Sequence, residues 1–146
     1  MIGLLQRVRS ASVEIAGQRV AQIGPGLLVL VGIQRADREP QALRLLDRLL
    51  TYRVFADDAG RMNRSLNDTG GDLLLVPQFT LAADTGSGNR AGFSSAAEPG
   101  PARALFGFLL DTAQQRWSQT QAGHFGADMQ VALVNEGPVT FWLEAH

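Results

Sequence analysis

The order of the elements predicted along this chain indicates an α+β domain with a largely antiparallel sheet. Consecutive strands come first, then one helix, more strands, a second helix and a closing pair of strands. This order differs from the regular alternation of parallel α/β folds. The 146 residues fit one domain, and a composition of 45% hydrophobic and 18% charged residues is globular. We therefore expect a single domain over residues 1–146.

The first part of the chain alternates strands and tight turns. Residues 2–9 and 11–16 have the period-two pattern of half-buried strands, and Gly17-Gln18 turns the chain into a further strand over residues 19–23. This pattern predicts a hairpin. The unbroken apolar run over residues 27–33 has the length of one strand and predicts a strand covered on both faces.

Two main helices are predicted outside the sheet. Asp37 is placed to cap the first helix, and Pro40 falls in its first turn. The second helix follows Pro101 and ends near Trp117. Regularly spaced apolar residues mark the inner face of each helix. They are Leu43, Leu46, Leu49 and Leu50 in the first helix, and Leu105, Phe108, Leu109 and Ala113 in the second.

The remaining strands are short and are separated by small residues. Residues 53–55 return to strand, and residues 72–79 form a strand that ends before a loose stretch over 82–101. A loop of this length in a compact domain is usually functional or mobile. Near the end of the chain, Gly137-Pro138 interrupts a period-two pattern. Because proline has no N–H, the pair is interpreted as a rigid turn between two strands.

The composition excludes several kinds of chemistry. The chain has no cysteine, which excludes disulfides, thiol nucleophiles and cysteine-ligated zinc. It also has no lysine, so its 13 basic side chains are all arginine, and Schiff-base chemistry and a Walker-type phosphate loop are excluded. A net charge of -1 argues against broad nonspecific nucleic-acid binding, but a protein that grips only the end of an RNA is compatible with it.

The pattern of hydrophobic residues gives no sign of membrane insertion or secretion. No apolar run approaches the ~20 residues that span a bilayer, and the first residues lack the layout of a signal peptide. We therefore expect a cytoplasmic protein with no membrane partner.

Two separated motifs are specific when they are taken together. Residues 77–84 read Pro-Gln-Phe-Thr-Leu-Ala-Ala-Asp, and residues 135–140 read Asn-Glu-Gly-Pro-Val-Thr. In this order, and with matching flanks, they resemble the two signature motifs of the D-aminoacyl-tRNA deacylase family, and the likeness covers essentially the whole chain. The resemblance implies a small barrel-like β core with the helices outside.

Side chains suited to ester hydrolysis are scarce in this sequence. His124, in a glycine-flanked turn, and the final His146 are the only groups that titrate near neutrality unperturbed, and no Gly-x-Ser-x-Gly elbow is present. Main-chain N–H groups are better candidates. At the end of the strand over residues 72–79, those of Phe79 and Thr80 can leave the ladder and form an oxyanion hole. Thr80 as a nucleophile is the alternative, although no base is evident beside it.

The resemblance implies roles for the two motifs. The carbonyl of the aminoacyl ester is expected to lie against the amides of Phe79 and Thr80, Gln78 helps to shape the pocket, and a ribose hydroxyl of the terminal adenosine assists the water. Gly137-Pro138 is expected to be cis, to come from the partner subunit of a homodimer, and to turn its carbonyls toward the α-carbon of the substrate. An L side chain would then collide, whereas a D side chain would be directed outward.

Three further positions acquire roles from the resemblance. Arg7 matches a position that braces the Gly-Pro turn, which a guanidinium can do by binding free carbonyls. Phe125 and Met129 match positions that line the adenosine end of the site. From the residue pattern alone, Arg7 fits a surface strand equally well, and the other two residues fit the core.

The chain departs from the family pattern at two places. Pro77 stands where the family usually has serine, so a side-chain hydroxyl is not essential there if the activity survives. The usual basic loop reads Gly-Asn-Arg-Ala-Gly-Phe over residues 88–93, which keeps Arg90 and Phe93 but lacks the lysine and proline.

We therefore expect a homodimer, without a metal or organic cofactor, that hydrolyses D-aminoacyl-tRNA and mischarged Gly-tRNA to free amino acid and tRNA. One alternative is a noncatalytic module that binds an RNA end, which Pro77 and the sparse general bases favour. Another is a β-rich structural dimer that neither binds RNA nor catalyses a reaction on it.

Overall fold

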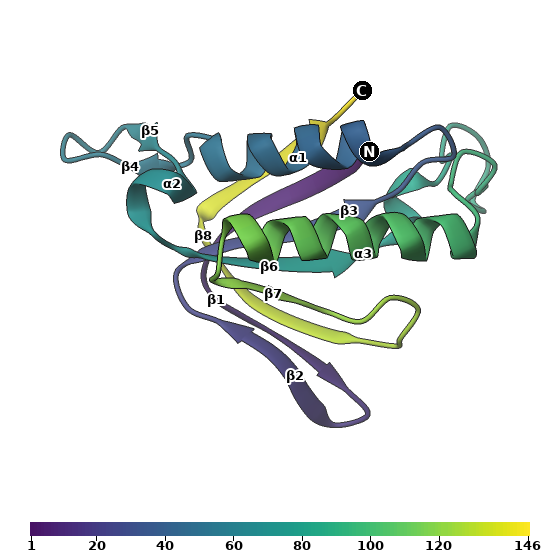
Figure 1. Cartoon of the computed structure of the whole chain (residues 1–146), viewed down its shortest axis with the longest axis horizontal. Coiled ribbons are helices and arrows are strands. Elements are labelled where there is room, and N and C mark those ends of the chain that lie inside the picture. The colour runs from purple at the N-terminus through teal and green to yellow at the C-terminus, as the bar shows by residue number, and fades with distance from the viewer.

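The computed structural model describes all residues, 1–146, and confirms the α+β prediction (Figure 1). The strands are β1 (Ile2–Ile15), β2 (Gln18–Ile23), β3 (Gly26–Gly32), β4 (Phe55–Ala56), β5 (Met62–Arg64), β6 (Asp72–Pro77), β7 (Thr120–Ala122) and β8 (Gln130–Glu144). The helices are α1 (Glu39–Thr51), the short α2 (Leu66–Thr69), the 3-10 helix η1 (Phe79–Ala82) and α3 (Pro99–Arg116). None of these helices combines the length and the apolarity needed to cross a membrane.

Strand β1 organises the main sheet. Its residues 2–8 pair with β3 and its residues 11–15 with β2, while β8 pairs along its opposite edge. These three pairings are antiparallel, as expected. The pairs β3–β6 and β6–β7 are parallel, because α1 and α3 carry the chain back across the sheet between them.

The sheet curls until strands β2 and β7 lie close together. The sheet order is β2-β1-β3-β6-β7, and the edge strands β2 and β7 are joined by the side chain of Gln121. Its Nε2 donates to the carbonyl oxygen of Gln22 at 2.7 Å, and its Oε1 accepts from the N–H of Gln22 at 2.8 Å. A side-chain amide thus substitutes for a strand partner. The resulting nearly closed barrel confirms the predicted barrel-like core.

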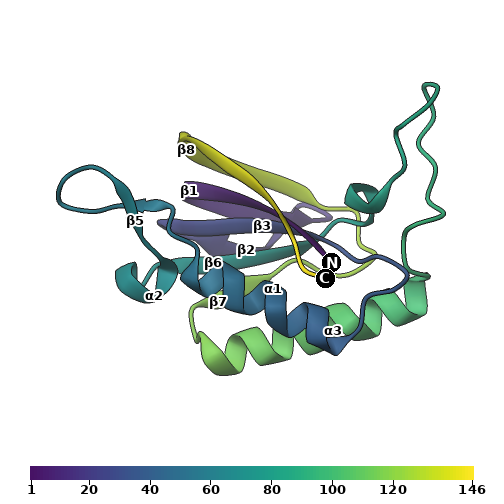
Figure 2. The same ribbon diagram turned by 90° about the horizontal axis from the view of Figure 1, so that it is seen from above.

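Apolar side chains form two cores, one on each face of the sheet. The larger core lies between the sheet and helices α1 and α3, which run side by side on the same face (Figures 1 and 2). The smaller core lies inside the curl and includes Val8, Val13, Leu28 and Leu74. Leu28 belongs to this inner core, whereas its neighbours on β3 belong to the larger one. The expectation that this strand is covered on both faces is therefore confirmed.

Three local predictions were wrong. Residues 2–15 form one continuous strand, because β8 pairs with β1 across the break that the sequence suggested. Gly137-Pro138 lies inside β8 and does not separate two strands. Asp37 does not cap α1, which begins after Arg38; its carboxylate instead accepts the main-chain N–H of Gln34 at 2.7 Å.

Several boundaries and short elements also differ from the predictions. Strand β6 ends at Pro77, and a 3-10 helix follows it directly. Helix α3 begins at Pro99 and includes Pro101, which the prediction placed before the helix. Leu43 is exposed and Phe108 is only half-buried, so the inner faces of the helices are narrower than their patterns suggested. The strand predicted over residues 53–55 is found, shifted, as β4. Helix α2 and strand β5 were not predicted, because they are too short to show periodicity.

Candidate active site

The end of strand β6 carries two main-chain N–H donors without a partner in the protein. The N–H of Gln78 continues the ladder and donates to the carbonyl oxygen of Val31 at 2.8 Å, and that of Leu81 donates to Gln78 at 3.2 Å. The N–H groups of Phe79 and Thr80, which lie between Gln78 and Leu81 in the chain, donate to no main-chain or side-chain acceptor. They are the first residues of η1, where N–H groups have no acceptor within the helix.

These two residues lie at the surface beside a cavity of about 490 Å³. The cavity is enclosed by the end of β6, the segment that precedes α3 and the turn that precedes β8. Its lining includes Gln78, Phe79, Phe93, Ala97 and Phe125. A smaller cavity of about 280 Å³ shares Gln78 and Phe79 and is bounded by Met129. The structure therefore brings Gln78, Phe79 and Phe125 together, with Met129 in the adjoining cavity.

Thr80 lies next to Gln78, and its side chain does not line either cavity. Its hydroxyl accepts a short hydrogen bond from Nε2 of Gln78. No histidine or carboxylate contacts this hydroxyl, so the structure supplies no base for a threonine nucleophile. His124 is exposed, and His146 pairs with Glu144 at 3.3 Å on the surface.

Aromatic side chains shape the mouth of the larger cavity. Phe93, from the loop that extends away from the body after η1 (Figure 2), packs against Phe79 with ring centroids 5.1 Å apart. The guanidinium of Arg103 lies over the ring of Phe125 at 5.0 Å from its centroid. Glu98 is the one carboxylate on the wall, and it stands at the rim with its side chain 73% exposed and paired with Arg35. The wall is therefore mainly apolar, with an open end.

A second cluster of predicted site residues lies within β8. Gln6 of β1 pairs with Thr140, and Val8 pairs with Asn135, so Arg7 alone faces residues 136–139. The peptide bond between Gly137 and Pro138 within this bulge is cis, and Gly137 has φ +122. A side chain at position 137 would be strained at this φ, and its Cβ would lie 3.0 Å from Nη2 of Arg7. Only glycine fits there.

Two side chains replace the ladder hydrogen bonds that the bulge removes. Arg7 donates from Nε to the carbonyl oxygen of Glu136 at 3.2 Å and from Nη1 to that of Val54 at 2.7 Å. Asn135 donates from Nδ2 to the carbonyl oxygens of Arg7 at 2.9 Å and Val139 at 3.0 Å. Thr140 holds the Asn135 amide in place through a hydrogen bond to Oδ1 at 3.2 Å.

Sequence reasoning assigned no role to Asn135 or Thr140. The available signal was that they flank the Gly-Pro pair within the same motif. Within one chain the two clusters stay separate: Gly137 and Pro138 are exposed, and they line neither cavity at the end of β6.

Two adjacent free N–H donors beside a largely apolar cavity can bind the oxyanion that forms when water attacks an ester carbonyl. The α+β fold and this pair of donors are features expected of a small hydrolase. The comparisons with known proteins agree with this class and narrow it.

A sequence model of the family described as D-Tyr-tRNA(Tyr) deacylase matches residues 4–144. A D-aminoacyl-tRNA deacylase of Alkalilimnicola ehrlichii is 63% identical over 145 residues, which cover 99% of this chain and 97% of that protein. The D-aminoacyl-tRNA deacylase of Thioalkalivibrio sulfidiphilus is 62% identical over 144 residues, again 99% of this chain and 97% of that protein. The chain thus belongs to the D-aminoacyl-tRNA deacylase family and is an ester hydrolase, which confirms the resemblance seen in its motifs.

Solved structures share the fold of this chain. A structure described as c-Myc DNA unwinding element binding protein superposes with a TM-score of 0.95 at 34% identity and covers 100% of this chain and 99% of its own. A probable eukaryotic D-amino acid tRNA deacylase has a TM-score of 0.85 and covers 98% of both chains. At 16% identity, this second likeness shows the fold alone.

Arg7→Lys is expected to destabilise the bulge in β8. A lysine ammonium cannot reach both carbonyl oxygens, so one half-buried acceptor loses its partner, at a cost of about 1–3 kcal/mol in the free energy of unfolding. Urea denaturation measures this loss.

Arg9→Lys is the matched control, because Arg9 is on the same strand, has a side chain that is 74% exposed, and forms a surface ion pair with the Glu136 carboxylate at 3.5 Å. Its unfolding free energy is expected to stay within about 0.5 kcal/mol of the original. Equal losses in the two variants would contradict the bracing role of Arg7.

Proposed function

We propose that this protein hydrolyses the ester bond of D-aminoacyl-tRNA, and of glycine mischarged on tRNA, to release free amino acid and tRNA. The observation that carries the proposal is the pair of unpartnered N–H groups of Phe79 and Thr80 beside the cavity that Phe125 lines. Family membership supplies the substrate class.

The proposed mechanism uses main-chain groups for charge and the substrate for proton transfer. The ester carbonyl lies against the amides of Phe79 and Thr80, which stabilise the oxyanion when water attacks. The only carboxylate on the cavity wall, Glu98, is exposed and paired with Arg35, so it is a poor general base. A ribose hydroxyl of the terminal adenosine therefore assists the water. Gln78 shapes the pocket, and Phe125 and Met129 line its adenosine end.

Selectivity is proposed to come from a second copy of the chain. Gly137 and Pro138 are exposed and lie outside the cavity of their own chain, and the carbonyl oxygens of Glu136 and Val139 on either side of them are held by hydrogen bonds. Strand β8 pairs only with β1, so its outer edge is open, and it exposes Leu133, Val134 and Trp142. A homodimer formed on this face would cover apolar surface and carry each Gly-Pro pair to the other cavity.

The central test compares D-Tyr-tRNA and L-Tyr-tRNA at matched enzyme concentration. The D-isomer is expected to be hydrolysed faster by a factor of about 10² or more, because fixed carbonyls exclude the L side chain. Release of labelled tyrosine measures both rates. Equal rates would refute chiral selection, and tRNA binding without hydrolysis of either substrate would refute the proposed reaction.

A matched pair of substitutions at Phe79 separates the amide from the ring. Both Phe79→Ala and Phe79→Pro remove the ring, but only proline removes the N–H. Proline is tolerated at the first position of a helix, and Gln78 before it has a non-helical φ of -141 and ψ of 83. The kcat of the proline variant for D-Tyr-tRNA is expected to be lower than that of the alanine variant by about 10²–10³.

Circular dichroism serves as the control that both Phe79 variants keep their fold. Similar kcat values in two folded variants would show that this amide does not bind the oxyanion.

Mixed dimers test the shared site directly. Gly137→Ala is expected to lose D-Tyr-tRNA turnover by about 10² because the braced carbonyls move, whereas Gly107→Ala, which has nothing within 4 Å of its added Cβ, retains it. When the Gly137→Ala and Phe79→Pro chains are co-expressed in equal amounts, half of the dimers formed are heterodimers. Each heterodimer has one intact site, made by Phe79 of one chain and Gly137 of the other. About a quarter of full activity is therefore expected to return. No restoration in purified heterodimers would show that each chain works alone.

A further inference from the structure

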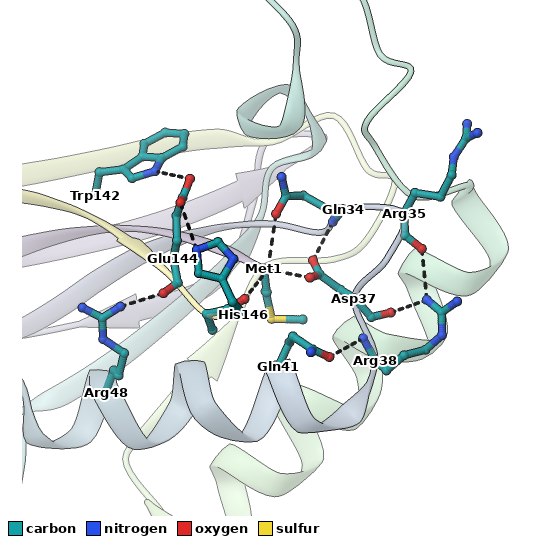
Figure 3. A network of polar contacts seen from close by, with 11 residues as sticks. Met1, Gln34, Arg35, Asp37, Arg38, Gln41, Arg48, Trp142, Glu144 and His146 are labelled. Atoms are coloured by element: carbon teal, nitrogen blue, oxygen red, sulfur yellow. Dashed lines mark hydrogen bonds and ion pairs between the residues drawn. The ribbon is translucent and has the colours of Figure 1, made fainter.

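The α-ammonium of Met1 is buried in an ion pair at the end of the β1–β8 ladder (Figure 3). It donates to Oδ1 of Asp37 at 2.6 Å, to the carbonyl oxygen of Ala145 at 2.8 Å and to Oε1 of Gln34 at 3.4 Å. Met1 is 1% exposed and Asp37 is 8% exposed. All three N–H donors of the ammonium therefore have an acceptor, and the two opposite charges are enclosed together.

Asp37 connects this ammonium to the chain that follows β3. Its second oxygen, Oδ2, accepts the main-chain N–H of Gln34 at 2.7 Å, and its own N–H donates to the carbonyl oxygen of Gln34 at 3.0 Å. Arg38 adds a hydrogen bond to the carbonyl oxygen of Asp37 at 2.6 Å. The turn over residues 34–37 is thus closed around a carboxylate whose countercharge is the Met1 nitrogen.

The same turn holds the wall of the active-site cavity. The N–H of Arg35 donates to the carbonyl oxygen of Ser95 at 2.9 Å, and the N–H of Ala97 donates to that of Ile33 at 3.0 Å. Residues 96–98 line the cavity together with Phe79. The α-ammonium is thus connected to this wall by hydrogen bonds through Asp37 to Gln34, and by the hydrogen bonds that the neighbours of Gln34 in the chain, Ile33 and Arg35, make to residues 95–97.

We infer that the free α-ammonium of Met1 is a structural cation of this enzyme, and that acylation of this nitrogen loosens the cavity wall. An acylated nitrogen has one N–H and no charge, so Asp37 would remain buried without a cation, which strongly destabilises a fold. The added carbonyl also needs space where Met1 is 1% exposed. The Met1 nitrogen is therefore a modification site that controls stability and, if the proposed function holds, substrate binding.

This inference sets a processing requirement on any copy of the chain that carries a formyl group on Met1. The formyl amide must be hydrolysed to formate and the free amine before the nitrogen is enclosed. Protonation of the released amine then supplies the three N–H donors that the site uses.

The chain offers a selective chemical test, because it contains no lysine and its α-amine is the only primary amine. The N-hydroxysuccinimide ester of acetic acid should leave the folded protein unmodified and add one acetyl group in denaturant, as mass spectrometry can show. Hydroxylamine then removes any ester formed at a hydroxyl. Acetylation of the folded and denatured chains at the same rate would overturn the burial on which the inference rests.

The acetylated chain is then refolded. The control is unmodified protein that is denatured and refolded in the same way without the acetylating reagent. Its melting temperature is expected to be lower by about 10 °C. Hydrogen exchange at the amides of Arg35 and Ala97 is expected to be faster, while that of the inner-core Leu74 changes little below the melting temperature. An unchanged melting temperature, or unchanged exchange at both amides, would overturn the inference.

Asp37→Asn keeps the proposal testable if the acetylated chain does not refold. This variant is expected to melt lower and to be acetylated faster than the original, because its ammonium loses the carboxylate. Acetylation should lower the melting temperature of this variant less than that of the unsubstituted protein, since acetylation and the substitution remove the same ion pair between Met1 and Asp37. Asp58→Asn is the control at an exposed aspartate and should change neither property. Fully additive effects of acetylation and Asp37→Asn would overturn the proposed coupling.

Activity gives a separate readout. The KM for D-Tyr-tRNA is expected to rise about fivefold in Asp37→Asn with kcat nearly unchanged, because the wall moves while the donors on η1 stay in place. If the unmodified enzyme hydrolyses no D-Tyr-tRNA, the proposed function fails, and the melting and exchange results still decide the structural inference. An unchanged KM in an active enzyme would refute the link to the cavity.

Discussion

The antiparallel ladder between β1 and β8 is the interaction on which the rest of the structure depends. It joins the first strand of the chain to the last. Its register shifts twice, at Arg7 and at Arg9, and the longer interruption is the one opposite Arg7. Main-chain groups that leave a ladder must find other partners, and here Arg7 and Asn135 supply them. The interruption therefore becomes a rigid feature with fixed carbonyls. At its end, the same ladder brings Met1 beside Ala145 and encloses the α-ammonium.

The same requirement for main-chain partners explains the cavity at the end of β6. A strand that passes directly into a 3-10 helix leaves the first N–H groups of that helix unpaired. In this chain those groups border an apolar cavity, where a donor interacts strongly with developing charge. A protein without cysteine or lysine can thus obtain catalytic groups from its main chain. Under the proposed function, specificity depends on backbone conformation, which glycine and proline control at position 137 and position 138.

The sequence predicted those features that depend on local pattern. Helices α1 and α3 and the doubly buried β3 have strong periodicity or an unbroken apolar run, and each was found close to its predicted position. The two free amides at the end of β6 were also expected, because strand ends can be placed from an apolar run.

Features that depend on distant partners could not be predicted from the residues alone. Asp37 looked like a helix cap because its partner, the Met1 nitrogen, lies 36 positions away in the sequence. The Gly-Pro pair looked like a turn because only the pairing of β8 with Arg7 shows that the strand continues. The role of Asn135 follows from the same bulge, so no local pattern could reveal it.

The pairing of the first strand with the last also has a consequence during translation. On the ribosome, β1 emerges at the beginning of synthesis, and β8 is the last strand to leave the exit tunnel. Until then one side of β1 keeps its hydrogen-bonding groups open, as does any unprotected sheet edge. The nascent chain therefore has a long interval in which chaperones or other unfinished chains can occupy the place that β8 will take.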